Sequence, residues 1–238
     1  MDDPSAETID RMGLAAFPAF VTEDRGNVVF RAAGGFNYRN SSVTVFDPGA
    51  ADGHALLAET LAFCEVNGIR PVLRVLGSPG ALEPVLQGAG WAPFRDCLVM
   101  TRTGNGGGWP EGLRDCDMAD WLDIQVRHKG LEGREAKLFR EIFAAMPDGA
   151  RPVAMGDGDP QATAMLYAEG GWLGLMNMLV ASEARGRGIG RRMLGLLLDV
   201  PADGMWLQVW EGNAAAVSLY ESAGFTTFYR YAYWAPDA

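Results

Sequence analysis

Apolar residues recur along this chain in short runs, and their spacing alternates between the period of a strand and that of a helix. Runs of β-branched and aromatic residues bounded by turn residues are typical of strands, and apolar residues three and four positions apart are typical of amphipathic helices. The pattern predicts helices at 5–20 (ending near Pro18), 56–66, 81–88, 118–126, 135–146, 190–198 and 214–223. It predicts strands at 28–33, 42–46, 71–76, 96–102, 152–155, 161–167, 172–180 and 205–209, with a closing pair at 225–234. The expected fold class is α/β, with mixed, largely antiparallel sheets and flanking helices.

A glycine-rich segment and an internal repeat organise these elements. Gly104-Asn105-Gly106-Gly107-Gly108 is typical of a linker, so we predict domains at 1–103 and 111–238 joined by a linker at 104–110. A shift of 134 residues, without a gap, aligns the two parts. It places Val72-Leu73-Arg74-Val75 on Trp206-Leu207-Gln208-Val209, Ala89-Gly90-Trp91 on Ala223-Gly224-Phe225, and Phe94 on Phe228. Two copies of one βα unit are therefore predicted.

The apolar strand at 172–180 leads into a segment that combines glycines with arginines. This segment is Arg185-Gly186-Arg187-Gly188-Ile189-Gly190-Arg191-Arg192, and an apolar helix follows it. Backbone N–H groups at a helix start lack intrahelical partners, the helix dipole adds positive charge, and glycines let an anion approach the backbone. The pattern predicts a phosphate site. Its rivals are a turn with solvated arginines and a G-x-G-x-x-G dinucleotide site, whose third glycine is replaced here by Arg191.

The corresponding stretch of the first copy is Ala51-Asp52-Gly53-His54-Ala55-Leu56, which has no arginine and a single glycine. The first copy keeps the packing residues and loses the polar ones. We therefore expect one working site, in the second half, and a structural first half.

The composition of the chain limits the classes of function that it can have. The chain has 238 residues, 48% of them hydrophobic, and a net charge of −10, which argues against broad binding of nucleic acid or of an anionic membrane. Cys64, Cys97 and Cys116 have no ligand-like spacing, and His54 and His128 lack companions, so we expect reduced, mostly buried thiols and no metal site. The acidic N-terminus lacks the apolar region of a signal peptide, and no apolar run approaches ~20 residues, so a cytoplasmic location is expected.

In these features the chain resembles the GNAT family of acetyl-CoA-dependent N-acyltransferases. Arg185 to Gly190 matches the family's pyrophosphate loop, R/Q-x-x-G-x-G/A. The family's later segment is matched by Gln208-Val209, Asn213, Leu219-Tyr220 and Gly224-Phe225. The resemblance covers roughly 110–234, and the first half resembles a truncated, degenerate copy, as in known tandem members. The strand before the loop contains no Glu or Asp, so the family's frequent carboxylate base has no candidate there.

The resemblance implies direct transfer of an acetyl group from acetyl-CoA to a primary amine of a small molecule or peptide. It implies that the strand at 172–180 is bulged and splays from the parallel strand at 205–209, so that the pantetheine arm bonds the backbone. The implied cofactor-binding residues are Met178, Leu179, Val180, Arg185, Gly186, Arg187, Gly188, Ile189, Gly190, Arg191 and Asn213, of which Asn213 is also a candidate helix cap. Tyr220 is the implied catalytic acid, which protonates or hydrogen-bonds the departing thiolate.

Several points stay open at this level. The base is a water or a carboxylate from elsewhere, such as Glu169 or Glu211. The aromatic stretch at 229–234 is expected to pack between the halves, with one face available to an acceptor pocket. A catalytically silent acyl-CoA sensor and a purely structural domain are the alternative functions. Acidic residues before the second half's first helix and along it would draw a cationic amine or simply be solvated: Asp117, Asp120 and Asp123.

Overall fold

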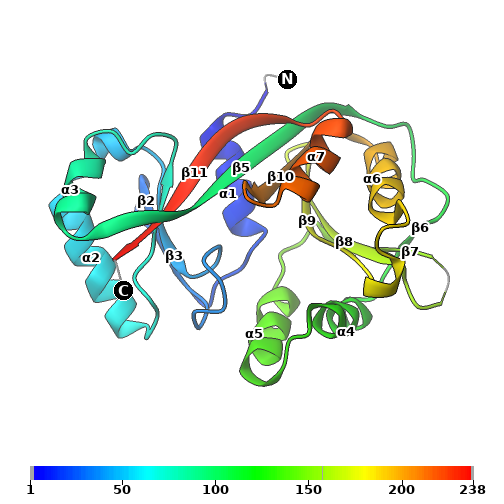
Figure 1. The fold of residues 1–238 in the computed structure, drawn as a ribbon, viewed down its shortest axis with the longest axis horizontal. Coiled ribbons are helices and arrows are strands. Elements are labelled where there is room, and N and C mark those ends of the chain that lie inside the picture. Colours follow the sequence, from blue (N-terminus) through cyan, green and yellow to red (C-terminus); the bar gives the residue numbers. More distant parts are fainter. Residues whose placement is uncertain (1–2, 157, 237–238) are drawn as a thin grey trace.

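The computed structural model describes residues 3–156 and 158–236, so Met1, Asp2 and the predicted turn residue Asp157 lie outside the described residues. Within them the chain forms one sheet of eleven strands, in the order β1-β2-β3-β4-β11-β5-β10-β9-β8-β7-β6 (Figure 1). The strands are β1 (Val21–Asp24), β2 (Val28–Ala32), β3 (Ser42–Val45), β4 (Leu73–Leu76), β5 (Trp91–Asn105), β6 (Leu113–Asp115), β7 (Ala150–Met155), β8 (Ala162–Glu169), β9 (Trp172–Val180), β10 (Ala202–Trp210) and β11 (Thr226–Pro236). The helices are α1 (Ala6–Ala15), α2 (Gly53–Val66), α3 (Leu82–Gly88), α4 (Met118–Lys129), α5 (Gly133–Ala144), α6 (Ile189–Asp199) and α7 (Ala214–Ser222).

The elements confirm the predicted α/β class, and the sheet is largely antiparallel, with parallel pairs only at β3–β4 and β9–β10 among the described strands. Two short strands, β1 and β6, were not predicted. The predicted closing pair at 225–234 is wrong, because these residues form the single strand β11. The chain continues through these residues without a turn. The register of β11 against β5 shifts at two points along the strand.

The two sequence halves exchange their last strands. β11, which ends the second half, lies between β4 and β5, whereas β5, which ends the first half, pairs with β10. Figure 1 shows both long strands crossing the molecule from one half to the other. The first two residues of the predicted linker, Gly104 and Asn105, belong to β5, and residues 106–110 connect it to β6. The halves therefore share one continuous sheet.

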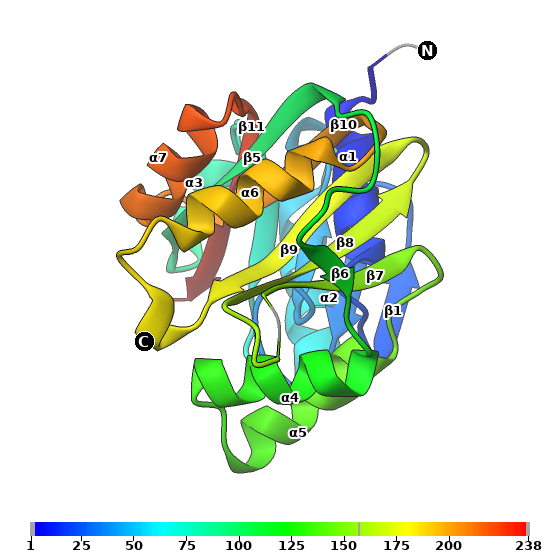
Figure 2. The ribbon, with the colours of Figure 1, turned by 90° about the vertical axis from the view of Figure 1, so that its right-hand side faces the viewer.

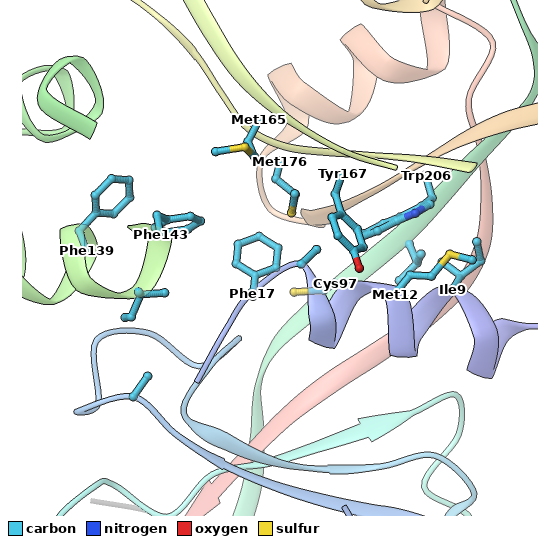
Figure 3. Close-up of a cluster of buried hydrophobic side chains, with 14 of the residues drawn as sticks. Ile9, Met12, Phe17, Cys97, Phe139, Phe143, Met165, Tyr167, Met176 and Trp206 are labelled. Atoms are coloured by element: carbon cyan, nitrogen blue, oxygen red, sulfur yellow. The ribbon is translucent and has the colours of Figure 1, made fainter. Parts of the chain in front are cut away.

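Helices cover the two faces of the sheet in different ways. α2 and α3 in one half, and α6 and α7 in the other, pack on one face around separate apolar clusters. α1, α4 and α5 lie on the opposite face, as the turned view of Figure 2 shows for α4 and α5 against α6. A third apolar cluster lies on this face and joins the halves. In Figure 3, Tyr167 and Trp206 of the second half lie beside Met12 and Ile9 of α1, and Met176 points toward Phe17.

A buried ion pair ties α1 to β4, and a tyrosine of the exchanged strand β11 joins it. Arg74 of β4 donates two hydrogen bonds to the Asp10 carboxylate of α1, one of them 2.5 Å long, and both side chains are buried. The Tyr229 hydroxyl of β11 donates to the same carboxylate over 2.6 Å. The Arg74 guanidinium also lies 3.7 Å from the centre of the Tyr231 ring. The group is satisfied internally, which buried charges require.

Candidate active site

β9 and β10 separate partway along their length. Their parallel pairing joins Trp172–Leu175 to Gly204–Leu207 and ends there. In the same region β9 is bulged, because its register against β8 shifts between Leu179 and Met176. Asn177 lies in this bulge with φ of 48°, a left-handed conformation that asparagine adopts more readily than most residues. The bulge and the splay predicted for this strand are thus confirmed.

A buried glutamine of the neighbouring helix α4 stabilises the bulge. Gln125 of α4 is fully buried, and its Nε2 donates to the Asn177 carbonyl and to Thr163 Oγ1, each over 2.9 Å. A carbonyl released from the sheet needs such a donor, since burying it unpaired costs about 1–3 kcal/mol. Beyond Leu207, the Gln208 carbonyl of β10 accepts from Arg39 Nη2 over 2.9 Å. Both strands are therefore stabilised in their separated positions.

The arginine–glycine segment forms the start of α6. Gly186 and Gly188 have φ of 73° and 75°, conformations that favour glycine, and a Cβ at either would meet no atom within 4 Å. Glycine is favoured at both positions because of the backbone conformation. No neighbouring atom of the described structure would clash with an added Cβ at either position. No side chain caps α6, and the first backbone bond of the helix runs from the Arg192 N–H to the Gly188 carbonyl over 3.0 Å. The N–H groups of the first turn are thus open, and the adjacent arginines are exposed.

α7 faces α6 and carries the second predicted group. Asn213 caps α7, because its side chain accepts from the Ala216 N–H over 3.2 Å. The Tyr220 ring packs edge-on against Phe225 with 5.9 Å between centroids, and its hydroxyl makes no hydrogen bond to the described residues. Burial raises the pKa of Tyr220, while the Arg39 guanidinium acts in the opposite direction. The phenol is therefore protonated at neutral pH.

Contacts connect this helix pair to the free part of β9. An added Cβ at Gly190 would meet Val180, Leu219 and Met178 at 3.6–3.8 Å, so α6, α7 and β9 converge at this glycine. A hollow of about 240 Å³ lies between α6 and α7 and is lined in part by Arg191, Leu194 and Leu219. The predicted cofactor residues thus gather on one face of the sheet, beside the splay.

A larger cavity, of about 510 Å³, opens on the opposite face. Asn177 and Trp210, which belong to the separated ends of β9 and β10, both line it. Its aromatic lining is Phe17, Phe36, Tyr38, Phe139, Phe143, Trp210 and Tyr233. Its charged lining is Arg39, Arg95 and Lys129, and no described residue that lines it is acidic. Residues of both halves line the cavity.

The segment at 33–41, which brings Tyr38 and Arg39 to the cavity, is fixed by internal hydrogen bonds. Ser41 Oγ accepts from the N–H groups of Ala33 and Gly35 over 2.9 and 3.2 Å. Arg31, which is buried, donates to the Arg39 carbonyl over 3.0 Å. The position of Arg39 is therefore set by the fold and not by a ligand.

Other residues considered from the sequence lie away from this cavity. Glu169 pairs with Trp172 at the far end of β9, and Glu211 forms an exposed ion pair with Arg230. Asp117 caps α4, whereas Asp120 and Asp123 line a different hollow beside α4. Cys97 does line the cavity, but burial raises the pKa of its thiol, which disfavours a nucleophilic thiolate.

Comparison with known proteins agrees with this geometry. The model of the acetyltransferase (GNAT) family matches residues 113–225. Residues 113–225 therefore form a domain of the GNAT family of acetyltransferases. The chain is 27% identical over 240 residues to the uncharacterized N-acetyltransferase YobR of Bacillus subtilis (strain 168), covering 95% of this chain and 96% of that one.

Two solved structures show the same fold over the whole chain. A GCN5-related N-acetyltransferase from Kribbella flavida matches with a TM-score of 0.66 at 17% identity, over 100% of this chain and 97% of that one. A tandem GNAT protein from the clavulanic acid biosynthesis pathway matches with a TM-score of 0.55 at 14% identity, over 98% and 88%. At these identities the likeness concerns the fold alone.

Sequence reasoning did not identify the residues that hold or line the opening between β9 and β10. Gln125 had a signal, because it is a polar residue on the apolar face that Trp121 and Leu122 define in α4. Arg39 and Arg95 had none, since they come from the half that lost the family motif. In the described part of the chain, no helix is long and apolar enough to cross a membrane, and no cluster of His, Cys, Asp and Glu could hold a metal ion.

Proposed function

We propose that this protein transfers an acetyl group from acetyl-CoA to a primary amine, in a site formed where β9 and β10 separate. The observation that carries the proposal is the position of this opening. It lies between the α6–α7 face, where the phosphate loop and Tyr220 are, and the 510 Å³ cavity on the opposite face. Two substrates that enter from opposite faces can meet there without sharing a binding surface.

The residues of the α6–α7 face fit acetyl-CoA. The open N–H groups at the start of α6 and the exposed Arg185, Arg187 and Arg191 suit a pyrophosphate. The β9 edge at 178–180 has lost its parallel partner, so backbone groups there can pair with the amides of a pantetheine arm. The Val180 carbonyl accepts from Arg185 Nε over 3.3 Å and would exchange this bond for one to the cofactor. Asn213 holds the start of α7 in place through its cap, and direct contact with the cofactor is a further proposed role.

Catalysis then needs positioning and two proton transfers. The amine nitrogen bonds to the thioester carbonyl carbon, and the carbon–sulfur bond breaks. Tyr220, whose hydroxyl has no partner among the described residues and whose raised pKa keeps it protonated, supplies a proton to the departing thiolate. The described cavity lining has no carboxylate, so the proton lost by the amine goes to water.

Binding of acetyl-CoA tests this function directly. A ligand that binds only the folded state must stabilise it, so acetyl-CoA at about 100 times its Kd should raise the Tm by about 5–10 °C. Release of free CoA thiol should follow when a panel of primary amines is added. No thermal shift at saturating acetyl-CoA would rule out the proposed cofactor site.

A binding-only role is the alternative. It is favoured by the absence of a carboxylate from the described lining of the cavity, which leaves no protein group that is an evident base. Such an acyl-CoA sensor would need the phosphate loop but not the Tyr220 hydroxyl. It predicts a thermal shift with acetyl-CoA and no thiol release with any amine.

A further inference from the structure

The 510 Å³ cavity has a charge opposite to that of the whole chain. The protein carries a net charge of −10, yet the charged groups lining the cavity are Arg39, Arg95 and Lys129. Charges more than about 8–10 Å away are largely screened by salt, so a ligand in the cavity responds to these three cations and not to the acidic surface. The net charge of the chain therefore does not indicate the charge of the acceptor that the cavity would bind.

These cations are not neutralised by the protein. Among residues 3–156 and 158–236, neither arginine nor Lys129 forms an ion pair. Arg39 uses one N–H group on the Gln208 carbonyl, and its guanidinium lies 5.0 Å from the Phe17 ring centre. Arg95 lies against the rings of Trp210 and Tyr38, at 5.4 and 5.7 Å. Aromatic contacts orient a guanidinium but leave its in-plane N–H groups available.

Lys129, the third cation, lies near the positive charge of Arg39, and their repulsion is energetically unfavourable. The Lys129 side chain is exposed to the solvent of the open cavity, but the surrounding protein lowers the pKa of its ammonium, and the positive charge of Arg39 lowers it further. Like charges gathered without a counter-ion destabilise the free protein. An anionic ligand would remove this repulsion on binding.

We propose that the acceptor amine carries an oxyanion, a carboxylate or a phosphate, on an apolar body, and that Arg39, Arg95 and Lys129 bind this oxyanion. Arginine forms paired N–H···O bonds with either group, and the aromatic walls of the cavity accommodate the apolar part. The first half thus supplies two of the three residues that select the acceptor. Polyamines and other purely cationic amines are excluded by the same charges.

Binding of acceptor analogues without a reactive amine tests this acceptor class apart from acetyl transfer, which it presupposes. The probes are 3-phenylpropionate and 2-phenylethyl phosphate as oxyanions, with neutral 3-phenylpropanamide and cationic 3-phenylpropylamine for comparison. Calorimetric titration should show at least one oxyanion binding about tenfold or more tightly than the amide and the amine, and the tighter oxyanion identifies its class. Equal binding of the amide, or tighter binding of the amine, overturns the proposal.

Variants locate the effect. Arg95→Gln and Lys129→Gln should each reduce the preference for the oxyanion over the amide by about tenfold. Lys137→Gln, at an exposed lysine of α5 outside the cavity lining, should leave the preference unchanged. Arg39 is not used, because its loss would also free the Gln208 carbonyl. A preference that survives both cavity variants would show that the oxyanion binds elsewhere.

The same protein samples are titrated with acetyl-CoA. Acetyl-CoA binding without oxyanion preference refutes the acceptor class alone. Oxyanion preference without acetyl-CoA binding refutes the transferase function and the acceptor role of the ligand, and leaves the cavity as an oxyanion-binding site.

Discussion

Cys97 of β5 pairs directly with Tyr231 of β11 at the centre of the sheet, and the two residues are related by the shift that aligns the sequence halves. The pairing of β5 with β11 is symmetric about these two residues. The register shifts at Phe228 of β11 on one side and at Phe94 of β5 on the other, and the same shift of 134 residues relates these two phenylalanines. The β4–β11 and β10–β5 pairs repeat the relationship, with Leu76 opposite Tyr231 and Trp210 opposite Cys97. The exchanged strands thus lie about a pseudo-twofold axis, which supports our proposal of two GNAT-like halves.

Because each half contains the last strand of the other, we predict that the halves unfold together. Differential scanning calorimetry should show one transition with a calorimetric enthalpy equal to the van't Hoff enthalpy. Neither 1–110 nor 111–238 should fold when expressed alone, since each leaves a long sheet edge unpaired. Two separated transitions in the full chain would contradict this expectation.

Replacing Arg185 and Arg187 together by alanine should weaken acetyl-CoA binding by about tenfold or more, because charge-assisted bonds to phosphate are lost. The fold should be preserved, since both side chains are exposed. Calorimetric titration of acetyl-CoA measures the change, with Lys137→Ala as the control for loss of positive charge. Unchanged affinity would show that the phosphates are held elsewhere.

Tyr220→Phe keeps the ring that packs against Phe225 and removes only the hydroxyl. If this hydroxyl protonates the thiolate, kcat should fall by about 10²-fold while the Kd for acetyl-CoA stays the same. Steady-state kinetics on an acceptor that the amine panel identifies, combined with titration, separates the two quantities. Unaltered turnover would remove Tyr220 from the mechanism.

Gly174 of β9 lies opposite Trp206 of β10, so close that an added Cβ would stand 2.4 Å from the indole ring. Gly174→Ala should therefore lower the free energy of unfolding by about 1–3 kcal/mol through overpacking. The matched control is Gly195→Ala in α6, where a Cβ meets nothing within 4 Å and helix propensity predicts a gain of about 0.5–1 kcal/mol. Urea unfolding of both variants should give shifts of opposite sign.

Asp10→Asn should be among the costly substitutions, because it leaves the buried Arg74 guanidinium without its counter-ion. Breaking a buried pair in this way costs about 3–5 kcal/mol. Asp24→Asn removes one of two carboxylates around the partly exposed Arg11 and should cost about 1 kcal/mol or less. Denaturant midpoints that fall equally for both would show that the buried pair has no special weight.

The sequence by itself determined the parts that depend on local chemistry. The glycines at 186 and 188, the cap at Asn213 and the strand–helix order follow from residues near one another in the chain, and so does the repeat. Most predicted helix and strand positions were confirmed for this reason. The bulge and splay of β9 were predicted from the family resemblance, because the members of a family share tertiary structure.

Only the tertiary structure decided which distant segments meet. Strand exchange depends on pairing between β5 and β11, which start more than a hundred residues apart, and no local pattern distinguishes exchanged strands from unexchanged ones. Arg39, Arg95 and Lys129 form no motif in the sequence, because they come from three segments that are far apart in the chain. They become a site only where the 33–41 segment, β5 and α4 converge beside the opening of the sheet, since charge acts through space and not along the chain.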